Sequence, residues 1–287
     1  MNQSVCAVVV SFHPPQEDIA NLAFIREQAQ YAVVVDNGSD EIPLTNLRKT
    51  CRMLDIHLIE NGANLGIAAA LNTGIRWALS QGCKWVVLFD QDSKPLPGFV
   101  EKLLHALVDH PQTQKIAIMA PSYVDARSNA PVAGTVYTRA GEVLAVQSSG
   151  SLMPMAVFEK EGWFDENFFI DCVDYEYCLR IRNHGWIFEE CKSAVLLHKA
   201  NSPTMHKVLG HKFYAANFSP LRRYYRARNF LWMLRRYGKT HLLFCLLLNL
   251  ANVNSMIKAI VAEDNRWEKL RSTFRGYVDG VWGNVSV

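Results

Sequence analysis

Short, continuous hydrophobic runs alternate with helix-like stretches over the first ninety residues. The runs are rich in valine and isoleucine and cover residues 5–12, 31–36, 56–60 and 84–90. Continuous apolar runs of this kind are typical of strands that are buried on both faces of a parallel sheet. Helices that cover that sheet are predicted at 18–30 and 44–54, and a third follows a Gly/Asn loop within 61–82 and ends at Gly82. The pattern therefore predicts an α/β fold with a mostly parallel central sheet and helices on both faces.

The pattern changes after about residue 116 and again after residue 198. The middle part mixes short apolar runs and turns with one helix, predicted at 173–183. Beyond it the chain is basic and helical, and Ser219 followed by Pro220 is a typical helix start. Two more helices are predicted at 242–263 and 267–277. We therefore expect an α/β domain at 1–200 and a C-terminal helical extension at 201–287.

No segment predicts a membrane-spanning helix or a signal peptide. The most apolar segment, LLFCLLLNL at residues 242–250, is shorter than the roughly 18 apolar residues that a spanning helix needs. We expect it to form a buried helix, with an interfacial membrane helix as the alternative. The N-terminus, MNQSVCAVVVSFHPP, lacks a positively charged region and predicts a first strand.

Composition narrows the class of protein. Hydrophobic residues make up 49% of the 287 residues and charged residues 20%, which suits a folded protein with a sizeable core. The net charge of +3 is too small to indicate a nucleic-acid-binding protein. The seven cysteines are scattered and lack CxxC spacing, which disfavours a zinc site and a disulfide framework and suits a reducing, cytoplasmic setting.

Polar side chains follow each of the four predicted strands. The carboxyl ends of parallel strands lie along one edge of a sheet, and ligands bind beyond that edge. The residues concerned are Ser11 and His13, Asp36 and Asn37, Glu60, Asn61 and Asn64, and Asp90 and Asp92. Their convergence predicts one polar site, and it is a stronger argument than any single motif.

Asp90 and Asp92 end the fourth strand, in the stretch LFDQDS. Two positions apart on an extended chain, they point to the same side, where their charges repel each other. A divalent cation removes that penalty, and Mg²⁺ commonly binds one or two carboxylates together with substrate phosphates. Capping of the turn before Pro95 is the alternative. The position after a buried strand favours binding of a metal ion and a diphosphate.

Two neighbouring loops carry residues suited to a nucleotide. The carboxylate of Asp36 only accepts hydrogen bonds, and a uracil or thymine ring offers one imide N–H. A turn formed by Asp36, Asn37 and Gly38 is the alternative. Gly66 and the small residues after it allow close approach of a ligand to the backbone, or close packing of a helix on the sheet. The spacing matches neither a P-loop nor GxGxxG.

Several acidic residues surround the start of the helix at 173–183. Asp171, Asp174 and Glu176 lie there, and they could complement the helix dipole. A transfer reaction needs one carboxylate near the acceptor hydroxyl as general base. Spacing alone leaves open which of these acids would serve.

In order and spacing these motifs resemble those of the inverting nucleotide-sugar glycosyltransferases of the GT-A type, family 2, and in particular bacterial rhamnosyltransferases. The similar stretches cover nearly the whole chain: VVVSFHP, VVVDNGSDE, NGANLGIAAALNTGI, LFDQDS, SSGSLMP, GWFDENFFIDCVDYEYCLR and RRYYRARN. The DxD motif is shared widely, whereas its order with the other motifs and YYRARN are more specific. The Glu-Asp pair of many relatives is Val173-Asp174 here.

The resemblance implies a role for each motif within a catalytic domain at 1–200. Asp174 would be the catalytic base, and Asp92 and His198 would bind a divalent cation, Mg²⁺ or Mn²⁺. The glycine that usually follows the family histidine is absent here. The nucleotide site, with Asp36 on the pyrimidine imide, would comprise Ser11, His13, Asp36, Asn64, Gly66 and Asp90. The acceptor or donor sugar would contact Gly150, Ser151, Asp171, Glu176, Arg226 and Asn229.

The implied reaction is inverting transfer of L-rhamnose from dTDP-L-rhamnose to a saccharide hydroxyl in the synthesis of O-antigen or capsule. The acceptor would be free or lipid-linked, and the enzyme would be cytoplasmic or peripheral at the inner face of the cell membrane. The alternatives are a UDP-sugar donor, a non-catalytic nucleotide-sugar binder and a nucleotidyltransferase. The last is disfavoured because SFHPPQED lacks the usual glycines and positive charge.

The arginines of the helix after Ser219 allow two interpretations. They are Arg222, Arg223, Arg226, Arg228, Arg235 and Arg236. They could form a solvated face that also closes the sugar site, or they could contact anionic lipid headgroups, as basic amphipathic helices do.

Overall fold

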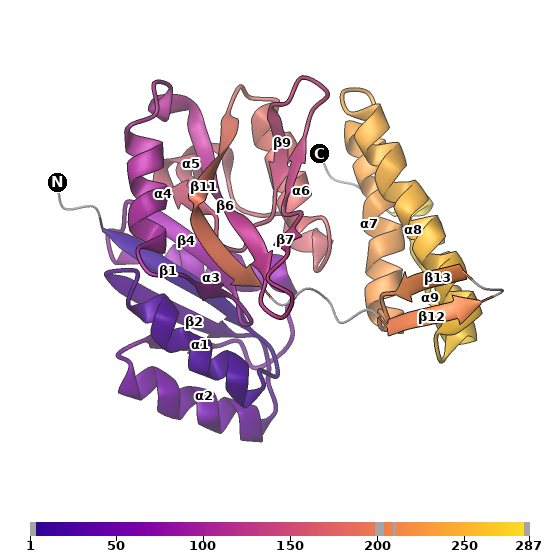
Figure 1. Cartoon of the computed structure of the whole chain (residues 1–287), viewed down its shortest axis with the longest axis horizontal. Coiled ribbons are helices and arrows are strands. Elements are labelled where there is room, and N and C mark those ends of the chain that lie inside the picture. Colours follow the sequence, from indigo (N-terminus) through magenta and orange to yellow (C-terminus); the bar gives the residue numbers. More distant parts are fainter. Residues whose placement is uncertain (1–3, 199–203, 209–210, 284–287) are drawn as a thin grey trace. The chain divides into compact units, whose positions relative to one another are not determined.

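A computed structural model describes residues 4–198, 204–208 and 211–283 (Figure 1). The chain forms two compact units. The first comprises residues 1–167 and 173–200, and the second comprises 168–172 and 201–287. The second unit thus takes in a segment of five residues from within the first. Each unit is described by itself.

The N-terminal half of the first unit is the predicted parallel sheet. Strands β3, β2, β1 and β4 lie side by side in that order, and every pair among these neighbours is parallel. The strands are β1 (Val5–Ser11), β2 (Tyr31–Asp36), β3 (His57–Glu60) and β4 (Trp85–Asp90), and the helices between them are α1 (Gln16–Arg26), α2 (Glu41–Met53) and α3 (Ile67–Ser80). The predicted alternation of strands and helices is confirmed.

The remaining strands extend the sheet beyond β4 in a mixed pattern. The order continues β10, β6, β11, β5; β10 is antiparallel to β4 and β6, whereas β6 and β11 are parallel. These strands are β5 (Lys94–Pro95), β6 (Ile116–Asp125), β10 (Leu152–Pro154) and β11 (Ile187–His198), with β7 (Pro131–Val132) beside β6. The other elements are α4 (Phe99–Val108), α5 (Met155–Glu161), α6 (Val173–Arg182), the hairpin of β8 (Thr135–Tyr137) and β9 (Val143–Val146), and two short 3₁₀ turns (Thr113–Lys115 and Glu166–Phe168). The α/β fold is confirmed, but the sheet as a whole is mixed: its β3–β2–β1–β4 part is parallel, whereas β10, β5 and β7 pair antiparallel with their neighbours.

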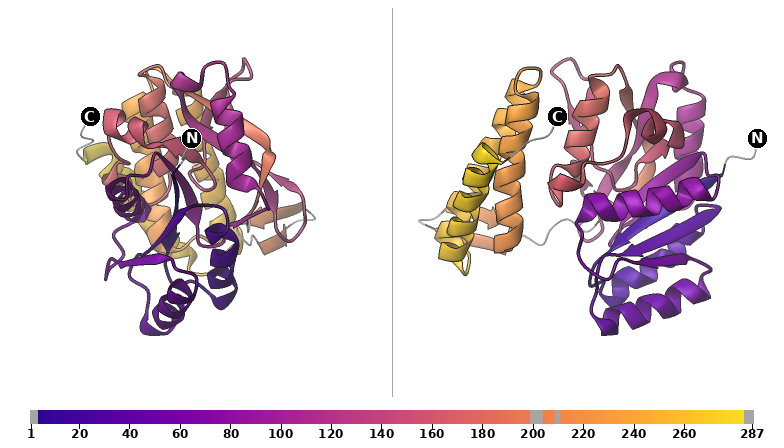
Figure 2. Two further views of the ribbon diagram at one scale, coloured as in Figure 1. Left: turned by 90° about the vertical axis from the view of Figure 1, so that its left-hand side faces the viewer. Right: turned by 180° about the vertical axis from the view of Figure 1, so that it is seen from behind.

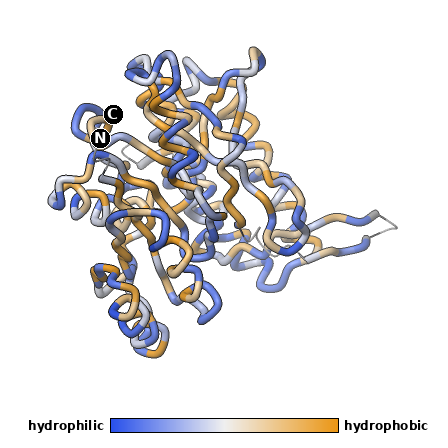
Figure 3. Tube along the Cα trace, turned by 60° about the vertical axis from the view of Figure 1, so that its left-hand side comes forward, coloured by the Kyte–Doolittle hydropathy of each residue, from blue (hydrophilic) through white to orange (hydrophobic). Residues whose placement is uncertain are grey.

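The core lies between this sheet and its helices, and the strands are predominantly hydrophobic in Figure 3. The small residues of α3 pack closely on it. A side chain at Gly74 would approach a methyl carbon of Val8 to 2.3 Å, and Ala68 and Ala70 are fully buried. Close packing of a small-residue helix on the sheet therefore explains much of the stretch after Gly66.

Three helices, α7 (Pro220–Tyr237), α8 (Leu242–Ala262) and α9 (Arg266–Trp282), run side by side in the second unit (Figures 1 and 2). The hairpin of β12 (Thr204–Val208) and β13 (His211–Ala215) accompanies them. The predicted start of α7 is confirmed, since the Ser219 hydroxyl accepts a hydrogen bond from the Arg222 N–H. A side chain at Gly276 would approach the Tyr224 carbonyl oxygen to 2.3 Å, so α9 packs closely on α7.

Helix α8 differs from the expectation of burial. Leu242, Leu246 and Leu250 are 54%, 47% and 64% exposed. The apolar pattern also continues past residue 250, so the helix has 21 residues and is long and apolar enough to span a bilayer by length and composition alone. The predictions of a buried helix and of a segment too short to span are therefore wrong. A different face of α8 is buried in the core of this unit, and it includes Cys245, Asn252 and Met256.

Candidate active site

Three neighbouring strands end together at the carboxyl edge of the sheet. Ser11 of β1 lies opposite Asp36 of β2, and Val10 lies opposite Asp90 of β4. The Phe12 N–H donates to the Gln91 side-chain oxygen at 2.8 Å, which ties the loops after β1 and β4 together. The strand register thus gathers Ser11, Asp36 and Asp90 at one edge.

Asp90, Asp92 and His198 form the one cluster within the described part of the chain that has the geometry for a metal ion. One ligand atom of each lies within 4.8 Å of the others. The short strand β5 explains the meeting, because Lys94 pairs with Leu197 and brings the loop after Asp90 beside His198. The Nδ1 atom of His198 lies 3.5 Å from an Asp92 oxygen; it is buried and has no hydrogen-bond partner.

The pKa of Asp92 is raised to about 6, chiefly because its carboxylate is desolvated; the charge of His198 lowers the pKa, and the nearby carboxylates of Asp90 and Asp18 add to the rise. Burial and like charge both disfavour the ionised form, and a bound cation reverses both effects. Carboxylate oxygens with an imidazole nitrogen suit Mg²⁺ or Mn²⁺. These residues could therefore bind a divalent cation. No sequence pattern marks Asp18, because the first turn of a helix is an ordinary place for an acid.

Asp36 forms a turn with the residues that follow it, which was the alternative to a nucleotide contact. Its carboxylate accepts hydrogen bonds from the N–H groups of Gly38 and Ser39, at 3.1 and 2.9 Å, and from the Ser39 hydroxyl. The Ser39 hydroxyl accepts in turn from the His13 N–H, at 2.7 Å. A carboxylate has about four acceptor positions, so contact with a pyrimidine imide is compatible with this turn and stays a prediction.

Asn37 organises the loop between β3 and α3. Its side-chain oxygen accepts from the Asn61 amide and the Leu65 N–H, and its amide donates to Asn64 and to the Gly66 carbonyl oxygen, all between 3.0 and 3.2 Å. No local sequence pattern marks this buried side chain as the centre of the loop. Asn64 and Gly66, the predicted nucleotide contacts, are held in place by it.

Asp174 lies in the first turn of α6, where its carboxylate accepts from the Tyr175 N–H at 2.9 Å. The buried phenol of Tyr123, in β6, donates to the Ser149 carbonyl oxygen at 2.8 Å. Burial raises the pKa of Tyr123, and the charges of Asp174 and Asp90 both add to the effect. The charges of both carboxylates therefore act on the pKa of the same phenol. No sequence signal marked Tyr123, because it lies within a strand that is otherwise largely apolar.

Gly150 and Ser151, predicted to contact a sugar, support the loop behind Asp90. Gly150 has φ +78°, and a side chain there would approach Pro121 to 2.7 Å. The Ser151 hydroxyl donates to the Gln147 carbonyl oxygen at 2.6 Å. The preceding Ser149 hydroxyl accepts from the Asp90 N–H at 3.2 Å. Contact of Gly150 or Ser151 with a sugar stays a prediction.

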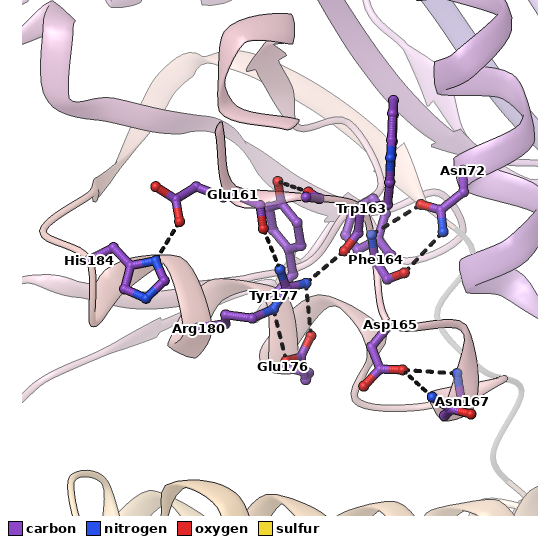
Figure 4. Close-up of polar contacts among 11 residues, drawn as sticks. Asn72, Glu161, Trp163, Phe164, Asp165, Asn167, Glu176, Tyr177, Arg180 and His184 are labelled. Atoms are coloured by element: carbon purple, nitrogen blue, oxygen red, sulfur yellow. Dashed lines mark hydrogen bonds and ion pairs between the residues drawn. The ribbon is translucent and has the colours of Figure 1, made fainter. Parts of the chain in front are cut away.

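Glu176, another predicted sugar contact, is fully buried and ion-paired with Arg180 at 3.0 Å (Figure 4). The same guanidinium donates to the carbonyl oxygens of Glu161 and Trp163, both at 2.7 Å. Glu176 therefore helps to hold the chain that follows α5. Contact with a sugar would require this pair to open, and it stays a prediction.

Asp171, Arg226 and Asn229 belong to the second unit, where they contact one another or the same chain segment. Most of the positive charge of α7 also has partners inside this unit. Arg223 is buried with Glu263, and Arg228 stacks over the Trp232 ring at 4.1 Å. Arg235 is exposed, so the two interpretations of the basic face stay predictions.

Solved structures with a similar fold are glycosyltransferases. A mannosyltransferase from Pyrobaculum calidifontis, in complex with GDP-Man and Mn²⁺, matches 97% of this chain and 87% of its own, with a TM-score of 0.59 and 15% identity. S. aureus TarS 1–349, in complex with UDP-GlcNAc, matches 97% and 81%, with a TM-score of 0.60 and 13% identity. At these identities the likeness establishes the fold, which is GT-A.

The sequence comparisons establish the family. The model of "Glycosyl transferase family 2" matches residues 22–137. The dTDP-rhamnosyl transferase RfbF of Shigella flexneri is 32% identical over 302 aligned residues, which cover 99% of this chain and 97% of the relative. The chain therefore belongs to glycosyl transferase family 2, and it is a glycosyltransferase. A hexosyltransferase of low-salt glycan biosynthesis, Agl10 of Haloferax volcanii, is 26% identical over 67% of this chain and 66% of its own.

Proposed function

We propose that the protein transfers L-rhamnose from dTDP-L-rhamnose to a saccharide hydroxyl, with inversion, in the synthesis of a bacterial surface polysaccharide such as O-antigen or capsule. The observation that carries the proposal is the gathering of Asp90, Asp92 and His198 at the strand edge that also holds Ser11 and Asp36. The choice of donor is supported by the relative RfbF, which is named a dTDP-rhamnosyl transferase.

Asp92 and His198 would hold the divalent cation, Mg²⁺ or Mn²⁺, and Asp90 would approach the ribose or the water shell of the cation. When bound, the cation neutralises charge on the leaving diphosphate. Asp36 accepts from the pyrimidine imide at the end of its turn. The other residues assigned to the nucleotide are Ser11, His13, Asn64 and Gly66.

Asp174 is the general base. Its carboxylate takes the proton of the acceptor hydroxyl as that oxygen attacks the anomeric carbon of rhamnose. The bond between the anomeric carbon and the diphosphate oxygen breaks, and dTDP leaves with the electron pair. Attack from the face opposite the leaving group inverts the configuration. Gly150, Ser151 and Glu176 support the sugar side.

A UDP-sugar donor is the competing function, because uracil offers the same imide as thymine and lacks only the methyl group. Titration calorimetry with dTDP, UDP and GDP, each with and without Mn²⁺, tests the base and the cation together. Transfer from dTDP-rhamnose to a rhamnose-accepting oligosaccharide tests the reaction. We expect dTDP to bind tightest and Mn²⁺ to strengthen binding. Tighter binding of UDP, or transfer only from a UDP-sugar, would refute the donor assignment.

We further propose that α8 lies on the cytoplasmic face of a membrane, where a lipid-linked acceptor would be found. Lys258 is the only charged residue among its 21, and its exposed leucines continue through Val253 and Ile257, which are 46% and 56% exposed. Trp267 and Trp282 of α9 are 71% and 81% exposed, and tryptophan favours the membrane interface. An uncharged face with exposed tryptophans in the same unit suits lipid better than a polar partner.

Flotation with vesicles of anionic and neutral lipids tests this contact. We expect the double variant Leu246→Glu, Leu250→Glu to lose flotation, whereas Ile42→Glu, at an 80% exposed position of α2, keeps it. Equal flotation of the three proteins would exclude α8 as the lipid contact. Sedimentation that shows concentration-dependent association, abolished by the double variant, would assign the face to a second copy instead.

A further inference from the structure

The segment Phe168–Cys172 lies immediately before α6 in the chain and packs with α7 in the second unit. Its backbone is strained. Phe169, Asp171 and Cys172 have φ angles of +56°, +61° and +66°, in the left-handed region that non-glycine residues seldom adopt. Strain of this kind persists only where the surroundings enforce it, and it gathers at functional sites. Asp174 follows this strained turn by two residues.

One side chain of α7 holds the backbone of the turn. The amide nitrogen of Asn229 lies 2.7, 2.8 and 2.9 Å from the carbonyl oxygens of Phe168, Ile170 and Asp171. Asn229 is fully buried, and its side-chain oxygen accepts from the Arg228 guanidinium at 2.9 and 3.0 Å. An ordinary extended or helical segment does not point three such carbonyl groups at one nitrogen, so the bonds select the left-handed turn.

Two arginines of α7 hold the side chain of the turn. Arg222 donates to both oxygens of Asp171, at 3.1 and 3.2 Å, and Arg226 donates to one of them at 3.1 Å. The Asp171 side chain is only 9% exposed. The rings of Phe169 and Tyr225 stack with their centroids 4.5 Å apart. Backbone, charge and ring contacts therefore fix the same five residues.

We propose that Asp171, Arg222, Arg226 and Asn229 are positioning residues, which set the direction in which the chain enters α6 and so orient Asp174. The inference rests on the proposed role of Asp174 as the base. A general base must lie within hydrogen-bond reach of the hydroxyl, and a displacement of about 1 Å costs on the order of 100-fold in rate. This role differs from the sugar contact expected for Asp171, Arg226 and Asn229, whose polar groups already bond to protein groups.

The four positioning residues, called the clamp below, are tested by steady-state kinetics of the variants Asn229→Ala, Asp171→Asn and Arg226→Gln. We expect kcat to fall about 10- to 100-fold, with KM for donor and acceptor within about twofold and calorimetric affinity for dTDP unchanged. Arg226→Lys keeps the charge and should recover part of kcat. Arg235→Ala is the matched control on α7, because Arg235 donates to the Gly280 carbonyl oxygen and not to the turn; it should keep kcat.

Hydrogen exchange gives a readout besides activity. We expect faster exchange of the amides at 168–174 in the three variants, with protection of the β1–β4 amides unchanged. The double variant Asp171→Asn, Arg226→Gln should be no worse than either single variant, because the pair acts as a unit.

Three outcomes separate the hypotheses. Raised KM with unchanged kcat would overturn the clamp and return these residues to sugar binding. Unchanged exchange at 168–174 would overturn it as well. Full activity of Asp174→Asn would instead refute the proposed base, whatever the clamp variants do.

Discussion

Buried Glu263 and partly buried Asp92 have pKa values that are shifted in opposite directions. Glu263 in the second unit accepts from Arg223 at 3.0 Å, from Lys269 at 2.8 Å and from the Asn217 N–H at 3.0 Å. Burial alone would raise its pKa, but the hydrogen bonds from Lys269 and Arg223 outweigh burial, so the pKa of Glu263 lies below its usual value. Two cations thus surround one carboxylate, and the cluster is complete within the protein.

The acids at the sheet edge of the first unit are arranged differently. The carboxylates of Asp90 and Asp18 raise the pKa of Asp92, whereas the charge of His198 lowers it. Within the described part of the chain, the Nδ1 atom of His198 has no hydrogen-bond partner. The pKa of Asp92 is therefore raised where that of Glu263 is lowered. The cluster of Glu263 with Arg223 and Lys269, the complete cluster, stabilises the fold by itself. In the cluster of Asp90, Asp92 and His198, the incomplete cluster, the negative charges would be compensated by a bound cation with its diphosphate. The difference supports the proposal that the cluster at the sheet edge, and not the one around Glu263, is the functional site.

The largest effect is expected at the base. Asp174→Asn keeps the size of the side chain but cannot take a proton, so transfer should fall by about 10³-fold or more. Affinity for dTDP, measured by calorimetry, should change less than about threefold. A loss of nucleotide binding instead would mean that Asp174 belongs to the incomplete cluster and contacts the donor.

Removing the centre of the complete cluster should destabilise the fold. Glu263→Ala leaves Arg223 and Lys269 buried without their partner, which costs about 3–5 kcal/mol in the free energy of unfolding. Urea denaturation measures it, and Arg271→Ala at an exposed position of α9 is the control. A cost below about 1 kcal/mol would show that the cluster contributes little.

The same cluster predicts the direction of the pH dependence. The pKa of Glu263 is lowered on folding, so its contribution to stability is present above the unfolded value of about 4.3 and is lost as the pH falls through the lower folded value. The wild type should therefore lose stability more steeply below about pH 4.5 than Glu263→Gln. Parallel stability curves for the two proteins in acid would contradict this assignment.

Removing an acid from the incomplete cluster should act in the opposite direction. Asp92→Asn relieves a buried like-charge repulsion, so the metal-free protein should gain roughly 1–3 kcal/mol in unfolding free energy at pH 7. The gain in melting temperature on adding Mn²⁺ should shrink in the same variant. Destabilisation of the metal-free protein would mean that Asp92 has a structural partner, as Glu263 does.

The sequence predicted the parts of the fold that follow from local periodicity. Strands buried on both faces appear as unbroken apolar runs, so β1, β2 and β4 could be located and their carboxyl ends aligned. The meeting of Asp92 with His198 could not be derived from spacing, because it depends on β5 pairing with a strand one hundred residues later in the chain. It was expected only from the family resemblance.

The roles of several side chains depend on partners that no local pattern identifies. Glu176 and Asp171 look like free acids near a helix start, yet both are ion-paired with arginines. Asn37 is predicted among the polar residues at the strand ends, but no local pattern marks it as the centre of the loop before α3, and Tyr123 lies in a strand that is otherwise largely apolar. Hydropathy also says nothing of which face of a uniformly apolar helix is covered, which is why the burial of α8 was predicted wrongly.

The smallest effect on the free energy of unfolding is expected on the exposed leucine face of α8. Two variants on this helix test it, one on the exposed face and one on the buried face. Leu250 is 64% exposed and Met256 is 7% exposed. Leu250→Ala should change the free energy of unfolding by less than about 0.5 kcal/mol, because the side chain leaves no cavity. Met256→Ala should cost about 2–5 kcal/mol, because it empties a packed position. Equal costs, measured by urea denaturation, would show that the leucine face is covered in solution by the protein itself. A negligible cost for Leu250 leaves that face available to lipid, and residues that are neutral for folding yet needed for flotation would be the signature of a docking surface.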